Sequence, residues 1–336
     1  MQAYRIFAPS PIETRPLVPQ ELPLPEPGPG QARIKVSVCG VCHTDLHIVE
    51  GDITPPRYPV TPGHQVVGRV DALPSASIPG QGVSVGDRVG IPWLHWACGE
   101  CGFCQRGMEN LCQSAQFTGL SVDGGFAEYM LADSRYVLPL PHDIPDEQAA
   151  PLLCAGIVGY RALKKAEIQP GERVGLFGFG ASAHLCIQVL RYWGCEVHVF
   201  TRSPAHQQHA LALGAVRATE ADSSGVALDK AVVFAPAGEV VIRALESIRP
   251  GGIVAINAIH TSDIPSFPYS KLWGERQIRS VANATRRDGE EFLALAAAAG
   301  LRSAVTVYPL NKANAALDDL KHSRFNGQAV LKVSDV

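Results

Sequence analysis

The spacing of apolar positions divides the chain into regions of different texture. Between residues 20 and 100, short Val- and Ile-rich runs such as ARIKVSV, HQVVGRV and DRVGI alternate with stretches rich in proline and glycine. Runs of β-branched residues separated by turn formers are typical of strands. This region therefore predicts a β-rich, barrel-like domain.

From about Pro151, apolar strands alternate with segments of helical periodicity. The predicted strands are RVGLFGF, EVHVFT, KAVVFA and GIVAIN, and the predicted helices are ASAHLCIQVLRYWG, AHQQHALALGA and EVVIRALESI. Such alternation is typical of βαβ units in a doubly wound parallel sheet. After about Val281 we predict an alanine-rich helix (EEFLALAAAAG), a strand (VTVYPL), a short helix (NKANAALDDLKH) and a last strand (QAVLKV). The fold class is therefore α/β.

Composition and charge narrow the class of protein. The 336 residues carry a formal net charge of −3 and no block of Lys and Arg, whereas a nucleic-acid surface requires a basic stripe, so we expect no nucleic-acid partner. The start, MQAYRIFAPSPIETRPLV, lacks the pattern of a secretory signal, and no stretch approaches the ~18 apolar residues of a membrane span. We expect a cytoplasmic protein without membrane contact.

A dense cluster of cysteines lies in the stretch ACGECGFCQRGMENLCQ. Its members are Cys98, Cys101, Cys104 and Cys112. Two thiolates three residues apart can reach one Zn²⁺ ion around a tight turn, and Gly99, Gly102 and Gly107 let the backbone bend in this way. Four thiolates fill the tetrahedral shell, so we predict a structural zinc that holds a loop too short to build its own core.

An iron–sulfur cluster, a redox dithiol and a disulfide are the alternatives for these cysteines. A ferredoxin cluster typically shortens the last gap to about three residues and follows it with proline, whereas here the gap is seven residues and Gln113 follows. In a reducing compartment, an odd total of nine cysteines indicates metal binding more than bridging.

Further motifs carry potential ligands: CGVCHTDLH at 39–47, PGHQVVG at 62–68 and PLLCAGIVGY at 151–160. Each motif alone is weak evidence for a metal site, because a single His or Cys is usually a core residue. Together with the cysteine cluster and GLFGFGASA, they resemble, in order and spacing, the zinc-dependent alcohol dehydrogenases of the medium-chain dehydrogenase/reductase superfamily over essentially the whole chain. The resemblance implies a GroES-like, zinc-binding catalytic domain over 1-155 and 282-336, and a dinucleotide-binding Rossmann domain over 156-281.

The resemblance further implies that Cys42, His64 and Cys154 bind a catalytic zinc and leave its fourth position open for water or substrate oxygen. Cys39 is the rival for the first ligand. In the family the ligand immediately precedes the His-Thr-Asp run, so we choose Cys42 and expect Cys39 in the core. Asp45 resembles the carboxylate that orients the zinc-bound imidazole; an ordinary turn aspartate is the alternative.

One residue departs from the family's pattern. The family usually has Glu after the zinc-binding His, and this chain has Gln65. A glutamine can still form hydrogen bonds but brings no negative charge near the metal. Any role of that carboxylate in ligand exchange is therefore in question for this chain.

The stretch GFGASA at 178–183 follows an apolar strand and opens a helix, which is the context of a dinucleotide-binding loop. Gly178 allows the tight turn, Gly180 lets the backbone approach the pyrophosphate, and Ala183 permits close packing of helix on strand. The helix N-terminus favours the phosphates, and a plain glycine turn is the alternative. By resemblance, His43 also faces the pyrophosphate.

The strand after this loop indicates which nicotinamide cofactor binds. NAD-preferring relatives end it with an acidic residue, whereas EVHVFTRS ends at Thr201, followed by Arg202 and Ser203, and no carboxylate lies between Val197 and Thr219. A guanidinium and hydroxyls suit a 2′-phosphate. We predict that NADP(H) is favoured and NAD(H) possible; an Arg202 that stacks on the adenine of NAD(H) is the alternative.

The reaction implied by the resemblance is reversible hydride transfer between a small primary or secondary alcohol and the nicotinamide. Thr44 resembles the hydroxyl that accepts the alcohol proton, and His47 resembles the relay that passes it to water, a task suited to imidazole; a plain surface histidine is the alternative. Trp93 and Trp96 lie where relatives line the substrate pocket, although aromatics at this spacing also suit a core.

Other classes of protein remain as alternatives at this point. A zinc-free quinone or enone reductase of the same fold needs none of the seven proposed ligands. A zinc-ribbon adaptor for nucleic acid or protein predicts a basic stripe, which the sequence lacks. We expect two zinc ions per chain, and a homodimer or homotetramer by resemblance alone.

Overall fold

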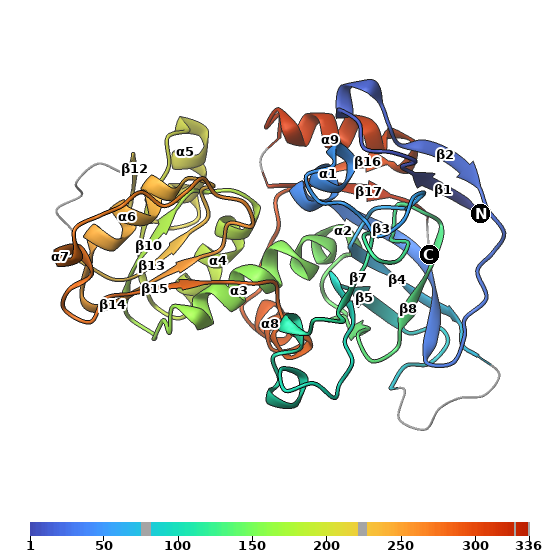
Figure 1. Cartoon of the computed structure of the whole chain (residues 1–336), viewed down its shortest axis with the longest axis horizontal. Coiled ribbons are helices and arrows are strands. Elements are labelled where there is room, and N and C mark those ends of the chain that lie inside the picture. Colours follow the sequence, from blue (N-terminus) through green and yellow to red (C-terminus); the bar gives the residue numbers. More distant parts are fainter. Residues whose placement is uncertain (75–81, 221–226, 326, 335–336) are drawn as a thin grey trace. The chain divides into compact units, whose positions relative to one another are not determined.

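The structure is a computed structural model that describes residues 1–74, 82–220, 227–325 and 327–334 (Figure 1). It divides into two compact units. The first comprises Met1–Cys154, Asn283–Ala294 and Ser303–Val336, and the second comprises Ala155–Ala282 and Leu295–Arg302. Each unit is described by itself below.

The second unit is built on a parallel sheet of six strands. Their order is β12 (Arg217–Thr219), β11 (Glu196–Phe200), β10 (Arg173–Phe177), β13 (Leu228–Val233), β14 (Ile248–Ile256) and β15 (Gln277–Ser280). Its helices are α3 (Ala155–Lys165), α4 (Ala181–Tyr192), α5 (Pro204–Ala212), α6 (Gly238–Ser247) and α7 (Tyr269–Leu272). The chain winds outward in one direction from β10 and in the other from β13, which confirms the doubly wound sheet. Ligands of such sheets bind at the carboxyl ends of the strands where the order reverses.

The first unit contains a seven-stranded sheet in which only β16 and β17 run parallel. Its order is β16 (Val305–Pro309), β17 (Gln328–Lys332), β3 (Gln31–Val41), β4 (Gln65–Ala72), β5 (Arg88–Ile91) and β9 (Leu138–Pro139), with β8 (Tyr129–Asp133) paired to β3. Two small sheets add β1 (Gln2–Arg5) with β2 (Val18–Glu21), and β6 (Leu94–Trp96) with β7 (Gln116–Phe117). The β-rich prediction for this part of the chain is confirmed.

Helices of this unit are shorter. They are α1 (His43–Glu50), α2 (Asp146–Ala149) and α9 (Ala313–Lys321), with α8 (Arg286–Ala298) contributing residues to both units. Single 3₁₀ turns are η1 (Ile12–Thr14), η2 (Cys104–Arg106), η3 (Glu109–Leu111), η4 (Ala150–Leu153) and η5 (Leu310–Lys312). Among the residues that the structure describes, no helix is long and apolar enough to cross a membrane.

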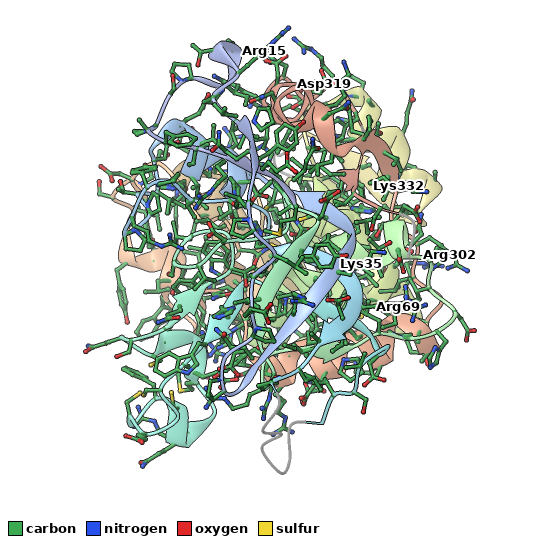
Figure 2. All side chains as sticks on the ribbon, turned by 90° about the vertical axis from the view of Figure 1, so that its right-hand side faces the viewer. Arg15, Lys35, Arg69, Arg302, Asp319 and Lys332 are labelled. Carbon is green, nitrogen blue, oxygen red and sulfur yellow. The ribbon has the colours of Figure 1, made fainter. Side chains whose placement is uncertain are left out.

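Side chains alternate along β3 as the pleat requires. Ile34 and Val36 are fully buried in the core, whereas Lys35 between them is partly exposed and lies opposite Arg69 of β4. Figure 2 shows Lys35 and Arg69 on the side of the sheet that faces the viewer. The strand therefore separates a charged face from the apolar core, and its carboxyl end leads directly into α1.

Candidate metal centres and cofactor loop

A buried carboxylate joins the start of α1 to the loop before β4. Asp45 is 0% exposed, and its Oδ2 accepts a hydrogen bond of 3.0 Å from the backbone N–H of Cys42. Its Oδ1 accepts from the N–H of Gly63 at 2.9 Å and from Nδ1 of His64 at 3.0 Å. Because a carboxylate only accepts, Nδ1 of His64 carries a hydrogen, and in the neutral ring Nε2 keeps the lone pair that can bind a metal.

The nearest potential metal ligands to this Nε2 are two cysteine sulfurs. His64 is fully buried, and its Nε2 has no hydrogen-bond partner within the described ranges. Nε2 and the Sγ atoms of Cys42 and Cys154 lie within 4.8 Å of one another. Two sulfurs and one imidazole nitrogen form a donor set that suits Zn²⁺ with one position left open. The residues therefore fit the predicted open metal centre.

The thiols and the imidazole of this group are electrostatically linked. A hydrogen bond from Cys154 holds the pKa of Cys42 well below its usual range and raises that of Cys154. Burial opposes a positive charge on His64, but Asp45 and Cys42 outweigh it and raise the pKa of the imidazole to about 10. A metal ion at this centre would displace these protons, as ligation by thiolate and neutral imidazole requires.

Cys39, the rival ligand, lies elsewhere. Its side chain is 0% exposed, and its Sγ lies 3.5 Å from the carbonyl oxygen of Gly40. It is not a member of the group formed by Cys42, His64 and Cys154. The prediction that Cys39 is a core residue is confirmed.

The four clustered cysteines converge on one point. Cys98 Sγ lies 3.8 Å from that of Cys104 and 3.6 Å from that of Cys112, and Cys101 lies 3.6 Å from Cys104. Thiolates bound tetrahedrally to one zinc at about 2.3 Å lie about 3.8 Å apart, whereas a disulfide needs about 2.05 Å. All nine cysteines are free, so the disulfide alternative is wrong.

The backbone of this cluster turns at glycines, with one exception to the prediction. Gly99 has φ of +76° and Gly107 has φ of +68°, a left-handed conformation that other residues rarely adopt. Gly102 does not have a positive φ, so its predicted role in the bend is wrong. N–H groups of Cys101 and Glu100 point at the sulfur of Cys98 and lower the pKa of this thiol to about 6, which favours the thiolate form that binds metal.

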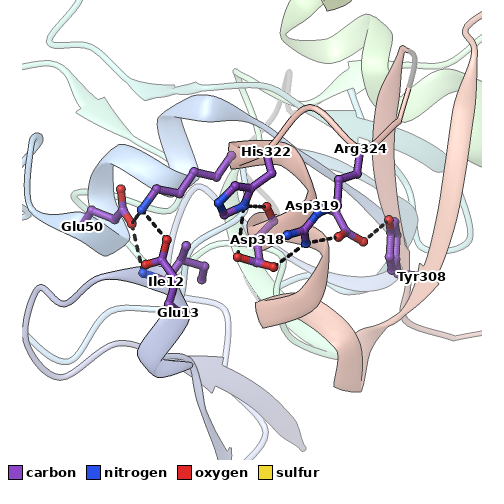
Figure 3. A network of polar contacts seen from close by, with 9 residues as sticks. Ile12, Glu13, Glu50, Tyr308, Asp318, Asp319, His322 and Arg324 are labelled. Atoms are coloured by element: carbon purple, nitrogen blue, oxygen red, sulfur yellow. Dashed lines mark hydrogen bonds and ion pairs between the residues drawn. The ribbon is translucent and has the colours of Figure 1, made fainter.

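A third group of possible ligands, Glu13, Asp318 and His322, is already paired (Figure 3). Lys321 donates to Glu13 at 2.8 Å, and Arg324 donates to Asp318 at 2.7 Å. Cations of the protein therefore already neutralise these carboxylates, and we interpret the group as an ion-pair network that fastens α9.

The remaining predicted residues of α1 follow the metal ligand Cys42. Thr44 is 4% exposed, and its Oγ1 lies 3.8 Å from Cys42 Sγ. His47 lies three residues further, on the same side of the helix, and its Nδ1 is 2.8 Å from Oδ2 of Asp52. His43 is exposed, and its ring centroid lies 6.5 Å from that of His47. Sequence reasoning missed Asp52, because an acidic residue after a glycine is typical of an ordinary turn.

Aromatic side chains flank the open centre. Trp93 meets the ring of His64 edge-on at 4.9 Å between centroids, and it stacks on Phe117 at 5.0 Å. Phe117 was not predicted, since it lies 24 residues away in sequence and carries no motif. Trp96 lies at the end of β6, paired with Gln116 of β7. Of the two predicted tryptophans, the structure thus places Trp93 against the proposed metal ligand His64.

The glycine-rich loop lies between β10 and α4 in the second unit. Gly178 has φ of +94°, and a Cβ there would come within 2.8 Å of the backbone nitrogen of Ala235. A Cβ at Gly180 would meet nothing within 4 Å, and no side chain caps the helix at this residue. Ala183 is fully buried. A tight turn, an open approach and an uncapped helix N-terminus are the features that pyrophosphate binding uses.

The segment after β11 carries the residues predicted to choose between cofactors. Arg202 is exposed, and the strand ends one residue earlier than expected, at Phe200. The carbonyl of Thr201 accepts a 2.7 Å hydrogen bond from Gln207. The hydroxyl of Ser203 caps α5 by accepting from the N–H of His206 at 3.4 Å, which leaves its own hydrogen available to donate.

Comparison with known proteins gives consistent matches. A family profile described as an alcohol dehydrogenase GroES-like domain matches residues 28–142. The chain is 45% identical to a probable alcohol dehydrogenase, AdhA, of Mycobacterium tuberculosis, covering 99% of this chain and 97% of the relative. It is 36% identical to an alcohol dehydrogenase of Geobacillus stearothermophilus, covering 95% and 97%. A cinnamyl alcohol dehydrogenase from Sorghum bicolor superposes with a TM-score of 0.89 at 25% identity, covering 98% and 97%.

Proposed function

Because the chain belongs to the zinc-type alcohol dehydrogenases of the medium-chain dehydrogenase/reductase superfamily, we propose that it interconverts small primary or secondary alcohols and their carbonyl compounds with a nicotinamide cofactor. The observation that carries the proposal is the convergence of Cys42, His64 and Cys154, with Nε2 of His64 buried and unpaired in the described part of the chain. A purely structural site would not leave a coordination position open.

Cys42, His64 and Cys154 would hold the catalytic zinc, and the four clustered cysteines the structural one. A zinc ion supplies a Lewis acid that polarises the substrate oxygen. Asp45 fixes the tautomer and direction of His64, so it acts as a positioning residue rather than on the substrate. The four sulfurs Cys98, Cys101, Cys104 and Cys112 leave no open position, so they stabilise their loop and take no part in the reaction.

Thr44 and His47 would carry the proton out of the site. The hydroxyl of Thr44 lies beside the donor set, where it can accept the alcohol proton while passing its own to His47. The His47 side chain is 24% exposed, so its ring reaches water. The order of burial along α1, from buried Thr44 to partly exposed His47, supports this direction of transfer.

The loop formed by Gly178, Gly180 and Ala183 would bind the cofactor pyrophosphate at the start of α4, with His43 as a further phosphate contact. Thr201 and Arg202 would face the adenosine ribose, and we infer that NADP(H) is favoured because Arg202 is exposed and no carboxylate lies between Val197 and Thr219. Stacking of Arg202 on the adenine of NAD(H) is the competing arrangement, and it predicts the opposite cofactor preference.

Trp93 with Phe117 would form one wall of the substrate pocket, because their stack abuts His64. An aromatic wall next to the metal favours small apolar alcohols. Trp96 stays a weaker candidate. We also propose a catalytic domain over 1-155 and 282-336 and a cofactor domain over 156-281, which correspond closely to the two compact units except that Leu295–Arg302 groups with the second unit. We further propose that the enzyme is a homodimer or homotetramer.

The competing functions predict different measurements. A zinc-free quinone or enone reductase would keep its activity after removal of metal, and a zinc-ribbon adaptor would bind nucleic acid or protein without oxidising alcohols. We would test purified protein on a panel of alcohols and aldehydes with NADP(H) and NAD(H), following nicotinamide absorbance. Turnover that survives Cys154→Ser in a folded protein would overturn the proposal.

A further inference from the structure

The chain reverses directly after α1 and returns a carboxylate to the helix. Gly51 adopts φ of +94°, and the N–H groups of Gly51 and Ile53 both donate to the carbonyl of His47, at 3.0 and 3.1 Å. This reversal brings Oδ2 of Asp52 to 2.8 Å from Nδ1 of His47. The ring and the carboxylate are therefore set by the same turn.

Neighbouring contacts hold that turn in place. A Cβ on Gly51 would lie 2.7 Å from Cβ of Pro9, so the backbone is closely packed here. The adjacent Glu50 accepts a 3.0 Å hydrogen bond from the N–H of Ile12 and a 2.8 Å contact from Lys321 of α9. Figure 3 shows Glu50 within this network. The end of α1 is thus fixed from both sides, which restricts where Asp52 can place its oxygens.

We propose that Asp52 is a positioning residue of the proton relay. This inference rests on the proposed role of His47. An ionised carboxylate can only accept, so Asp52 keeps a hydrogen on Nδ1 and makes Nε2 the basic nitrogen. As Thr44 passes a proton outward, the Thr44 O–H bond breaks and an Nε2–H bond forms; Nε2 then releases that proton to water, and Thr44 regains one from the alcohol. Asp52 stabilises the intervening imidazolium by its negative charge.

Because His47 and Asp52 are both partly exposed, we expect their contact to affect the reaction rate and to contribute little to stability. The side chains of His47 and Asp52 are 24% and 56% exposed, and ion pairs in such positions contribute little to stability. Asp52→Ala should therefore leave the fold intact. Asp143, another exposed acid of the same unit, provides a matched control, because Asp143→Ala removes the same charge away from the relay.

The experiment compares zinc-loaded wild type, Asp52→Ala, Asp52→Asn and Asp143→Ala. The tautomer of His47 is read from ¹⁵N resonances of histidine-labelled protein, assigned with His47→Gln, and hydride transfer is followed in single turnovers. We expect wild type to hold the Nδ1–H tautomer. Asp52→Ala should shift the ring toward Nε2–H and slow hydride transfer roughly 10-fold, with cofactor KM unchanged. This is less than the ~10²–10⁴-fold of a positioned proton transfer itself, because Asp52 acts only through His47. Asp52→Asn, whose amide oxygen still accepts but carries no charge, should restore the tautomer and only part of the rate.

The experiment distinguishes a failure of the Asp52 assignment from a failure of the proposed proton relay. If His47→Gln slows hydride transfer but Asp52→Ala leaves both the tautomer and the rate at wild-type values, the assignment of Asp52 is overturned while the proposed function stands. If His47→Gln itself keeps the full rate, the relay is overturned and Asp52 loses its role with it. In the double variant His47→Gln/Asp52→Ala, a further loss beyond His47→Gln alone would also contradict the inference, because Asp52 is proposed to act only through His47.

Discussion

Gln328 on β17 donates a 2.6 Å hydrogen bond from its Nε2 to Oε1 of Gln65 on β4, and both side chains are buried, at 2% and 0% exposure. The same Nε2 lies 3.2 Å from the carbonyl of Val41. One amide therefore links the residue before Cys42 to the residue after His64. The glutamine that departs from the family's pattern thus accepts a hydrogen bond from another neutral amide.

Gln328→Leu should destabilise the protein and loosen the open centre. The substitution leaves the buried oxygens of Gln65 and Val41 without their donor, which costs about 1–3 kcal/mol per group. Urea unfolding should show a lower free energy of unfolding, and zinc should be lost faster from the three-ligand site to a chelator. An unchanged rate of zinc loss would show that the amide link does not hold Cys42 and His64 in place.

Cys154→Ser and Cys104→Ser should separate the two metal centres. We expect wild type to hold two equivalents of zinc, one for each convergent group. Cys154→Ser should abolish turnover in a folded protein that keeps one equivalent, because an open site contributes chemistry more than stability. Cys104→Ser should chiefly lower the melting temperature, because a closed site ties down a loop without a core. Elemental analysis, calorimetry and turnover measure the three quantities, and reversed phenotypes would reverse the assignment.

Thr44→Ala should slow hydride transfer by ~10²-fold or more, since it removes the hydroxyl that carries the proton. The affinity for the cofactor should change little. Thr44→Ser is the matched control, because it keeps the hydroxyl and should keep most of the rate. Single-turnover rates together with cofactor titration would decide, and a near-normal rate in Thr44→Ala would remove this residue from the mechanism.

Arg202→Ala should lower the preference for NADP(H) over NAD(H). A guanidinium can bind a 2′-phosphate through two hydrogen bonds, so its loss should reduce kcat/KM for NADP(H) roughly 10-fold or more while leaving NAD(H) nearly unaffected. Arg217→Ala, on the neighbouring strand β12, serves as a control for loss of charge. Wild-type preference for NAD(H), or an unchanged ratio in the variant, would contradict this role of Arg202.

His184 should make the protein less stable in mild acid. It lies in α4 at 2% exposure, and burial lowers its pKa from 6.5 to about 4. Between these values the unfolded chain binds the proton and the folded chain does not, so the free energy of unfolding falls as pH decreases. This group alone accounts for roughly 2 kcal/mol between pH 7 and pH 5.

The control for this prediction is His184→Leu, which removes the titrating group from the same buried position. Urea unfolding at several pH values should show a shallower decline for the variant between pH 7 and pH 5. If wild type and variant decline in parallel, the proton uptake of unfolding comes from other groups.

The sequence by itself determined the features that depend on local spacing. The C-x2-C spacing gathers thiolates around a turn, and GFGASA between an apolar strand and a helix defines the cofactor loop. The apolar periodicity from Pro151 onward predicted the parallel sheet. These features need only a few consecutive residues to take up their geometry. The helix α1 escaped prediction because its eight residues are too few to show a clear helical periodicity.

Only the tertiary structure decided the partners of the site residues. Gln65 and Gln328 are 263 positions apart and meet because β17 and β4 both pair with β3. Asp52 reaches His47 only through the reversal at Gly51. Trp93 abuts His64 because β6 and β7 place Phe117 behind it. In each case a side chain's role follows from contacts between segments that fold together only in the complete tertiary structure. These contacts are stabilised by the packing of the whole core, which no local sequence pattern encodes.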